Sequence, residues 1–156
     1  MKIYFIMLML IAIGFSGCKK SQPECIASPL SVEASELAQF CTDNGINYTV
    51  DANGIYYQIL TQGAGSFASN DSVITIAYTS NDLKGNTFNA VTADTPEKDF
   101  LYNFIEGWRL AIPYIQKGGH IKMVIPSSLC YGCSGSNAIP PNTPLYFDVY
   151  LIDVSN

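Results

Sequence analysis

The sequence predicts an α+β domain in which several antiparallel strands pack with one short helix, preceded by a helical extension. Three observations support this fold class. Apolar and polar residues alternate in several short segments, which is typical of strands with one buried face. A short helical pattern around the only tryptophan lies between two such segments. The chain has 156 residues and is 48% hydrophobic, which suits one domain with a substantial core.

The N-terminus is predicted to direct export. Lys2 precedes an apolar run over residues 3–15, which is shorter than the roughly 20 residues that a membrane-spanning helix needs. The run ends in Phe-Ser-Gly-Cys at 15–18, which resembles the lipobox of bacterial lipoproteins, where the cysteine is lipidated and becomes the first residue. We therefore expect an exported protein anchored to a bacterial membrane through lipid on Cys18. An ordinary signal peptide with an unmodified Cys18 is the alternative.

A helix is predicted over residues 33–42, where Leu37, Phe40 and Cys41 share one side. Ser31 is placed to cap its start, and Asn44-Gly45 is placed to end it. The predicted organisation is a lipoprotein signal peptide at 1–17, a tether at 18–32, a helical extension at 33–53 and the main domain at 54–156.

The main domain is predicted to contain mostly strands. The alternating segments with β-branched or aromatic residues are 55–60, 73–79, 120–125 and 145–151. Lys84-Gly85-Asn86 predicts a hairpin tip that leads into Thr87-Phe88. The short helix is expected within 107–115 and is interrupted by Pro113.

Composition argues against several kinds of function. The formal net charge is -5, and three of the 8 Lys and Arg residues (Lys2, Lys19 and Lys20) lie at the N-terminus, so nucleic acid is not an expected partner. The only histidine, His120, begins a predicted strand and is expected to be solvated. No nucleophile motif or metal-ligand set is apparent, so no cofactor or metal is expected.

Four cysteines follow Cys18: Cys25, Cys41, Cys130 and Cys133. An even number in an exported protein suggests disulfides, and the sequence leaves the three possible connectivities open. The C-x-x-C at 130–133 lies in a segment rich in glycine and proline, so we expect structural thiols or a disulfide there. A redox pair and a metal site are less favoured alternatives, since no helix start and no second ligand pair accompany the motif.

Several short motifs then occur in a characteristic order. They are Ala77-Tyr78-Thr79, Gly85-Asn86-Thr87-Phe88, Gly107-Trp108, Gly118-Gly119, Tyr131-Gly132, Ile139-Pro140-Pro141-Asn142 and Leu145-Tyr146-Phe147-Asp148-Val149. Together, over about residues 54–154, they resemble the FK506-binding-type (FKBP-type) peptidyl-prolyl cis-trans isomerases. The helix before Gly-Ile-Tyr-Tyr at 54–57 resembles lipoprotein members from Bacteroidetes-like bacteria. The resemblance implies a twisted antiparallel sheet wrapped around one short helix, with a pocket between them.

The resemblance also implies the residues of the pocket. Trp108 would form the floor, and Tyr131 would offer its hydroxyl. The walls would be Tyr78, Phe88, Phe104, Ile105, Ile139 and Phe147, and the Ile105 backbone N–H would bind a ligand carbonyl. One further aromatic is expected before Trp108, and Phe100 is the candidate. Asn89 departs from the family pattern, which has Asp beside the tyrosine that corresponds to Tyr131.

The implied function is prolyl isomerisation that helps exported proteins to fold, with proline-containing polypeptides as substrates and no cofactor. Macrolides of the FK506 type are further expected ligands. Because Asn89 carries no charge, the activity is expected to be reduced. The alternative is a catalytically weak polypeptide-binding or chaperone module, and a thiol oxidoreductase acting through Cys130 and Cys133 is a third possibility.

Overall fold

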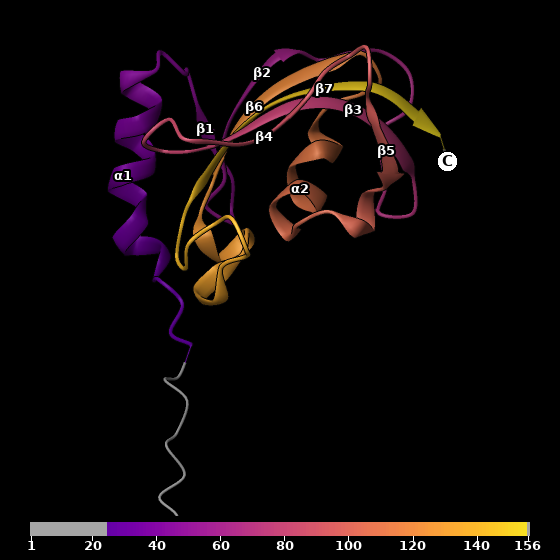
Figure 1. Cartoon of the computed structure of the whole chain (residues 1–156). Helices are drawn as coiled ribbons and strands as arrows, with labels where there is room; N and C mark the ends of the chain where they lie inside the picture. Colours follow the sequence, from indigo (N-terminus) through magenta and orange to yellow (C-terminus); the bar gives the residue numbers. More distant parts are fainter. Residues whose placement is uncertain (1–24, 156) are drawn as a thin grey trace, which may run out of the picture.

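The computed structural model describes residues 25–155 and shows a curved antiparallel sheet with one short helix in its hollow (Figure 1). A longer helix lies at one end of the sheet, next to the N-terminal segment. The predicted fold class is therefore confirmed. The predicted signal peptide and Cys18 lie outside the described residues.

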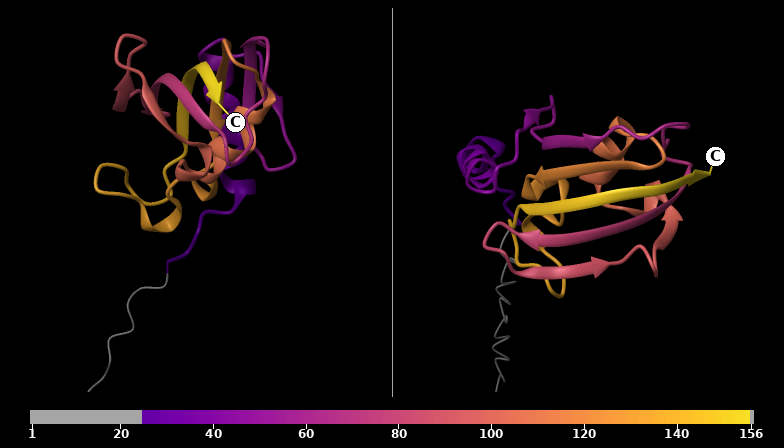
Figure 2. Two further views of the ribbon diagram at one scale, coloured as in Figure 1. Left: turned by 90° about the vertical axis from the view of Figure 1, so that its right-hand side faces the viewer. Right: turned by 90° about the horizontal axis from the view of Figure 1, so that it is seen from above.

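The sheet has seven strands, and every pairing is antiparallel. They are β1 (Thr49–Val50), β2 (Tyr56–Thr61), β3 (Val73–Asp82), β4 (Thr87–Val91), β5 (Glu97–Phe100), β6 (Gly119–Ile125) and β7 (Leu145–Ser155). The order is β1-β2-β6-β7-β3-β4, and β5 also pairs with β3. Figure 2 shows the strands running side by side, with the long helix seen end-on at one end of the sheet.

Two strands share the edge beyond β3. β4 pairs with the half of β3 that contains Tyr78, and β5 pairs with the half that contains Ile74. The predicted hairpin tip is confirmed, because Gly85 has a φ of +89° and the Asp82 carboxylate accepts hydrogen bonds from Lys84 N–H and Asn86 N–H. Residues 92–96 then carry the chain from β4 to β5. The pocket residues of β4 and β5 thus flank β3 along one edge.

The short helix α2 (Glu106–Ala111) continues into a 3-10 turn at Ile112–Tyr114, which contains Pro113 as predicted. It packs against alternate residues of β6 and β7, including Met123 and Phe147. The main hydrophobic core therefore lies between α2 and the concave face of the sheet. Its buried residues include Ile55, Ile74, Ile76, Leu101, Trp108, Ile112, Ile115, Ile121, Ile125, Leu145, Val149 and Leu151.

The longer helix α1 spans Leu30–Asp43, so it begins before the predicted start. The prediction that Ser31 caps it is wrong, because the N-cap is Pro29 and no side chain caps the helix there. Asn44 and Gly45, the latter with a φ of +63°, end it as predicted. Within residues 25–155, no helix has the length and apolar character needed to cross a membrane.

α1 packs on the opposite face of the sheet from α2. Its Leu37 and Cys41 bury against Tyr56 and Val124, and Val124 alternates along β6 with Met123, which faces the main core. Burial raises the pKa of the Cys41 thiol to about 11, so this cysteine behaves as a small apolar residue. The second core is much smaller than the first.

Polar and covalent links also hold α1 in place. Glu33 is buried, and its two carboxylate oxygens accept hydrogen bonds from the N–H and the hydroxyl of Ser127. The Tyr56 hydroxyl donates to the carbonyl oxygen of Ala34. A disulfide joins Cys25 to Cys133, so the predicted tether is tied to the main domain at Cys25.

One sequence-based expectation about the outer face of the sheet is wrong. His120 was expected to be solvated, but its side chain is only 15% exposed. Its Nε2 hydrogen-bonds to Asp148, and its ring stacks on Tyr150 at 3.7 Å between centroids. The neighbouring strand β7 supplies both partners, because His120 and Tyr150 lie directly opposite each other.

Candidate functional site

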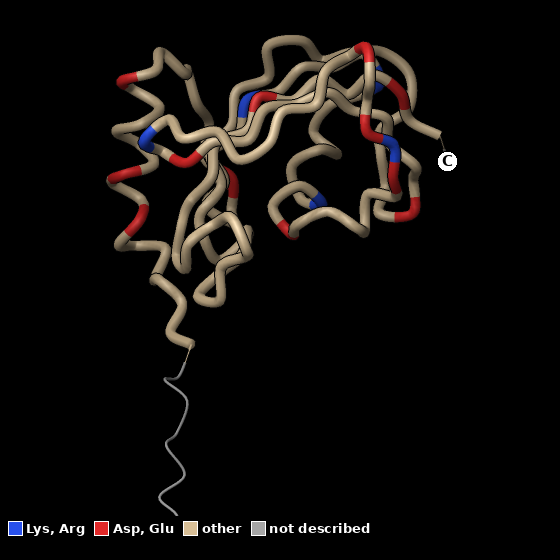
Figure 3. The backbone as a smooth tube through the Cα atoms, in the orientation of Figure 1, with Lys and Arg blue, Asp and Glu red and all other residues tan. Residues whose placement is uncertain are grey.

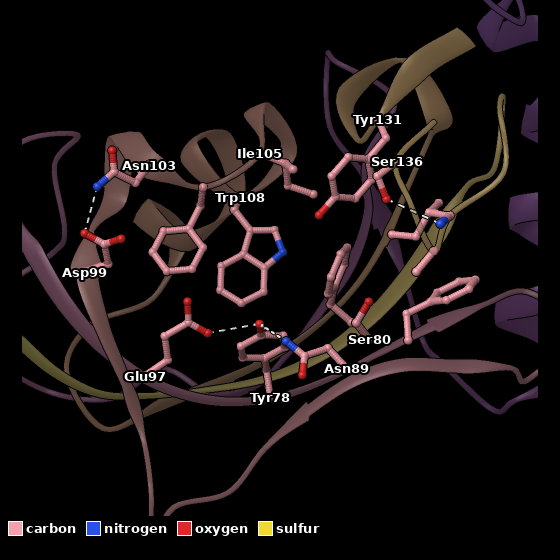
Figure 4. Close-up of a pocket in the computed structure, with 15 residues that line it drawn as sticks. Tyr78, Ser80, Asn89, Glu97, Asp99, Asn103, Ile105, Trp108, Tyr131 and Ser136 are labelled. Carbon is pink, nitrogen blue, oxygen red and sulfur yellow. Dashed lines mark hydrogen bonds between the residues drawn. The ribbon is translucent and has the colours of Figure 1, made fainter. Parts of the chain in front are cut away.

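The structure places all nine predicted site residues around one cavity of about 450 Å³ between the sheet and α2 (Figure 4). These residues are Tyr78, Phe88, Asn89, Phe104, Ile105, Trp108, Tyr131, Ile139 and Phe147. They come from β3, β4, the segment 104–105 that leads into α2, α2 itself, β7 and the segment between β6 and β7. Residues far apart in the sequence therefore form one aromatic cleft.

Trp108 forms the floor of the cleft and is only 2% exposed. Its indole stacks on Phe104 with a centroid distance of 5.1 Å, while Tyr78 and Phe147 contact it edge-on at 5.0 and 5.3 Å. Gly107 permits this packing, because a Cβ there would lie 2.5 Å from Cγ2 of Ile125. The floor of the cleft is thus part of the main hydrophobic core.

One end of the cleft offers hydrogen-bond donors that have no acceptor within residues 25–155. They are the Trp108 indole N–H, which is fully buried, the Ile105 backbone N–H and the Tyr131 hydroxyl. Figure 4 shows the nitrogen-bearing edge of Trp108 turned toward Ile105 and Tyr131. Burial raises the pKa of Tyr131, so its hydroxyl remains protonated at neutral pH. A carbonyl oxygen is the natural acceptor for such donors.

The segment that carries Tyr131 and Ile139 is held by its own hydrogen bonds. Gly135 N–H donates to the Tyr131 carbonyl, and Ser136 N–H donates to the Ile139 carbonyl. Gly135 has a φ of +64°, and a Cβ there would lie 2.5 Å from the Ile139 oxygen. Only glycine fits this position, which fixes the two pocket walls relative to each other.

A polar chain lies at the other side of the floor. The Tyr78 hydroxyl donates to Oε2 of Glu97 at 3.0 Å and accepts a hydrogen bond from the Asn89 side-chain amide at 2.7 Å. Burial, followed by the nearby Glu97 carboxylate, raises the pKa of Tyr78 to about 12. The Asn89 side-chain amide thus bonds to Tyr78, while Asn89 and Tyr131 line the same cavity.

Sequence reasoning missed part of the lining. The additional residues are Ser80, Glu97, Asp99, Asn103, Ser136 and Ala138. The strand β5 was missed because Glu-Lys-Asp-Phe is short and polar, and only the alternation of Glu97 and Asp99 could have indicated it. Phe100 was the wrong candidate for a further pocket aromatic, because it does not line the cavity and instead stacks on Tyr102 at 5.0 Å.

Within residues 25–155, Cys130 and Cys133 do not form a C-x-x-C disulfide. Cys133 is bonded to Cys25, 108 residues away, and not to Cys130. Cys41 and Cys130 are free, so the described part of the chain has one disulfide. Burial raises the pKa of Cys130, which disfavours the thiolate that thiol exchange requires. Within residues 25–155, no three His, Cys, Asp or Glu side chains are grouped to bind a metal.

The fold and the cleft together define a ligand-binding α+β domain whose site opens between a curved sheet and one short helix. The sequence matches the model of the FKBP-type peptidyl-prolyl cis-trans isomerase family over residues 64–152. This match covers more than half of the chain. The protein therefore belongs to the family of FKBP-type peptidyl-prolyl cis-trans isomerases.

Individual relatives agree with this assignment. The FKBP-type isomerase FkpA of Buchnera aphidicola is 38% identical over 106 residues, covering 67% of this chain and 42% of that protein. FkpA of Escherichia coli is 35% identical over 117 residues, covering 74% of this chain and 43% of FkpA. This chain therefore spans less than half of the length of these curated relatives.

Solved structures give the same result. The crystal structure of FkpA from Escherichia coli has a TM-score of 0.72 and 32% identity, covering 80% of this chain and 59% of that one. A peptidyl-prolyl cis-trans isomerase from Pseudomonas syringae pv. tomato has a TM-score of 0.68 and 28% identity, covering 84% of this chain and 99% of that one.

Proposed function

We propose that this protein is a peptidyl-prolyl cis-trans isomerase that acts on proline-containing segments of exported proteins. The observation that carries the proposal is the convergence of the nine predicted residues on one cavity with an indole floor. Family membership adds to it. The proposed roles are an apolar floor from Trp108, walls from the other aromatic and isoleucine side chains, and donors from Ile105 and Tyr131.

The chemistry needs no nucleophile, metal or cofactor. Rotation about an X–Pro bond takes tens to hundreds of seconds unaided, because amide resonance is lost in the twisted state. The twisted amide has a less polar carbonyl than the planar one, so an apolar cleft destabilises the planar form relative to the twisted form. The proline ring would lie over Trp108, and the Ile105 N–H would bind a neighbouring carbonyl oxygen. The resemblance to the family implies that a macrolide of the FK506 type would place its ring and its carbonyls at the same positions.

A protease-free exchange assay on a Leu-Pro tetrapeptide tests the proposal. The mature protein should accelerate exchange, and Tyr131→Phe, which removes one hydroxyl, should lower kcat/KM several-fold. Tyr102→Phe is the matched control, because Tyr102 is exposed and does not line the cavity. If the natural protein does not accelerate exchange, the assigned site is contradicted. It is also contradicted if Tyr131→Phe and Trp108→Leu both accelerate exchange as well as the natural protein does.

The second candidate is a polypeptide-binding or chaperone module with little turnover. The neutral Asn89 favours it, because the family pattern has an acid at this position. Trp108 fluorescence separates the two candidates: a binding module changes its emission with a proline peptide or an FK506-type macrolide but gives no exchange.

We also propose that the protein is exported and anchored to a bacterial membrane through lipid on Cys18. The motif at 15–18 supports the anchor, and the Cys25–Cys133 disulfide suits an oxidising compartment. Cys18→Ser should move the protein from the membrane fraction to the soluble fraction. A variant that remains membrane-bound after a carbonate wash would contradict the anchor.

A further inference from the structure

The cleft has an acidic side formed by β5. Glu97 and Asp99 line the cavity, and Lys98 between them does not. Figure 3 shows this succession of acid, base and acid along β5. Residues two apart in a strand face the same side, so Lys98 faces away from the cleft. On that side the pKa of Asp153 is lowered, chiefly by Lys117 and to a smaller degree by Lys98. Both carboxylates are thus directed to the cleft, while the intervening cation is not.

Each carboxylate keeps one oxygen without a hydrogen-bond partner in residues 25–155. Glu97 accepts the Tyr78 hydroxyl on Oε2, which leaves Oε1 available. Asp99 accepts hydrogen bonds from Asn103 and from the Phe100 N–H on Oδ1, which leaves Oδ2 available. Among residues 25–155, no Lys or Arg lines the cavity, and Arg109, which follows Trp108 along α2, is absent from its walls. The two negative charges are therefore uncompensated within the cleft.

The opposite side of the same floor offers neutral hydrogen-bond donors. The buried indole N–H of Trp108 has no acceptor in the described part of the chain, and its nitrogen edge is turned toward Ile105 and Tyr131 (Figure 4). A buried donor without a partner is costly, so a bound group with an acceptor would satisfy it. The cleft is therefore polarised, with donors for carbonyl oxygens at the Tyr131 side and carboxylates at the β5 side.

We infer that the cleft selects proline-containing segments in which a Lys or Arg residue adjoins the proline. The inference rests on the proposed function and specifies its substrate class. With carbonyls bound at the Tyr131 side, a long cationic side chain next to proline can reach Glu97 and Asp99, whereas an acidic one is repelled. Glu97 and Asp99 are then specificity-determining residues, and they act on binding rather than on the twisting of the amide.

The size of the effect follows from the partial exposure of these carboxylates. Exposed ion pairs are weak and are screened by salt, so the preference is expected to be modest and dependent on ionic strength. We expect kcat/KM for a Lys peptide to exceed that for the matched Glu peptide by about five-fold at low salt. In 0.5 M NaCl the ratio should approach one.

The test compares peptides that carry Lys, acetyl-lysine or Glu on either side of one proline, in the protease-free exchange assay with the mature protein. Acetyl-lysine keeps the length of the side chain and removes its charge. The preference for Lys should disappear in Glu97→Gln/Asp99→Asn, whose amides still offer acceptors to Tyr78 and Asn103. Glu36→Gln/Asp43→Asn, on the exposed side of α1, makes the same change in net charge and should keep the preference.

If the Lys, acetyl-lysine and Glu peptides react at equal rates, whether the variable residue precedes or follows proline, the inference is overturned. This result would leave the isomerase activity intact. A preference that persists in Glu97→Gln/Asp99→Asn would also overturn it. If no peptide is isomerised, the proposed activity itself fails. The affinities of the same peptides for the protein are then compared by Trp108 fluorescence. Equal affinities would overturn the charge preference. Folding of each variant is checked by its circular dichroism.

Discussion

The two helices are attached to the same sheet in opposite ways. α2 has only 6 residues, yet Trp108 and Ala111 belong to the main core, and Trp108 is also the floor of the cleft. α1 has 14 residues but buries only Glu33, Leu37 and Cys41. The length of a helix therefore says little about how much of the molecule depends on it.

Their attachments also differ in kind. Apolar packing holds α2, whereas α1 combines a small apolar contact with specific links: the Glu33–Ser127 hydrogen bonds and the Cys25–Cys133 disulfide. Both links end in the segment between β6 and β7, which also supplies Tyr131 and Ile139 to the cleft. On the α2 side the site is therefore part of the main core, whereas on the α1 side it is held by links that lie outside the cleft.

The largest effect is expected on the α2 side. Trp108→Ala should lower the free energy of unfolding by about 3–5 kcal/mol, because it removes a fully buried aromatic side chain and leaves a cavity. It should also abolish detectable isomerisation, since the floor of the cleft is lost. Urea unfolding followed by circular dichroism measures the stability, and the exchange assay measures the rate.

Leu37→Ala provides the matched test on α1. Leu37 is fully buried, so we expect a loss of about 2–4 kcal/mol. At a temperature where the variant remains folded, kcat/KM should stay within two-fold of the natural value. A large fall in kcat/KM would show that α1 contributes to the site directly, and the contrast between the helices would not hold.

Removal of the covalent link is expected to have the next largest effect. Cys25→Ser/Cys133→Ser opens a loop closed over 108 residues, and such links contribute about 2–4 kcal/mol, chiefly by restricting the unfolded chain. The melting temperature should therefore fall, while kcat/KM should change by no more than a few-fold. Cys130→Ala is the control, because this thiol is free. An unchanged melting temperature in the double variant would argue against this pairing.

The buried carboxylate of α1 should have a smaller effect. Glu33→Ala leaves the N–H and the hydroxyl of Ser127 without their acceptor, which should cost about 2–3 kcal/mol. Glu33→Gln keeps one acceptor oxygen and should cost less. Glu36→Ala, one turn further along the exposed side, should change stability by no more than about 0.5 kcal/mol. Equal costs for Glu33→Ala and Glu36→Ala would contradict a role for this link.

A smaller effect on stability than for Glu33 is expected for Asn89, which lines the cleft. The family pattern alone predicts that Asn89→Asp restores a charge and raises kcat/KM several-fold. In the structure, however, Tyr78 already donates to the Glu97 carboxylate and accepts from the Asn89 amide. A carboxylate at position 89 cannot donate to the Tyr78 hydroxyl, and it would lie close to the Glu97 carboxylate on the other side of that hydroxyl. We therefore expect the free energy of unfolding to fall by about 1 kcal/mol and kcat/KM not to rise.

The double variant Asn89→Asp/Glu97→Gln sharpens this prediction. It exchanges the acid and the amide around Tyr78 and should recover the stability lost in Asn89→Asp. A single Asn89→Asp variant that is both stable and several-fold faster would instead support the simpler interpretation, in which the missing acid limits the rate.

Much of the fold could be predicted from the sequence because it depends on neighbours along the chain. The alternation over 145–151 indicated the buried face of β7, Pro113 indicated the end of α2, and Gly85 indicated a hairpin tip. The pocket residues followed from the order of short motifs that resemble a known family. Each of these signals is local or lies in a fixed order, so it can be recognised before the chain is folded.

Contacts between residues that are far apart in the sequence could not be predicted, because they depend on how the whole chain packs. The sequence left the cysteine pairing open, and Cys25 meets Cys133 because α1 runs past the segment between β6 and β7. Glu33 suited the first turn of a helix, yet its burial depends on Ser127, 94 residues away. Glu97 and Asp99 belong to a short polar strand, and they face the cleft because β5 pairs with the outer edge of β3. Such contacts are fixed by the packing of the whole sheet, which no single segment encodes.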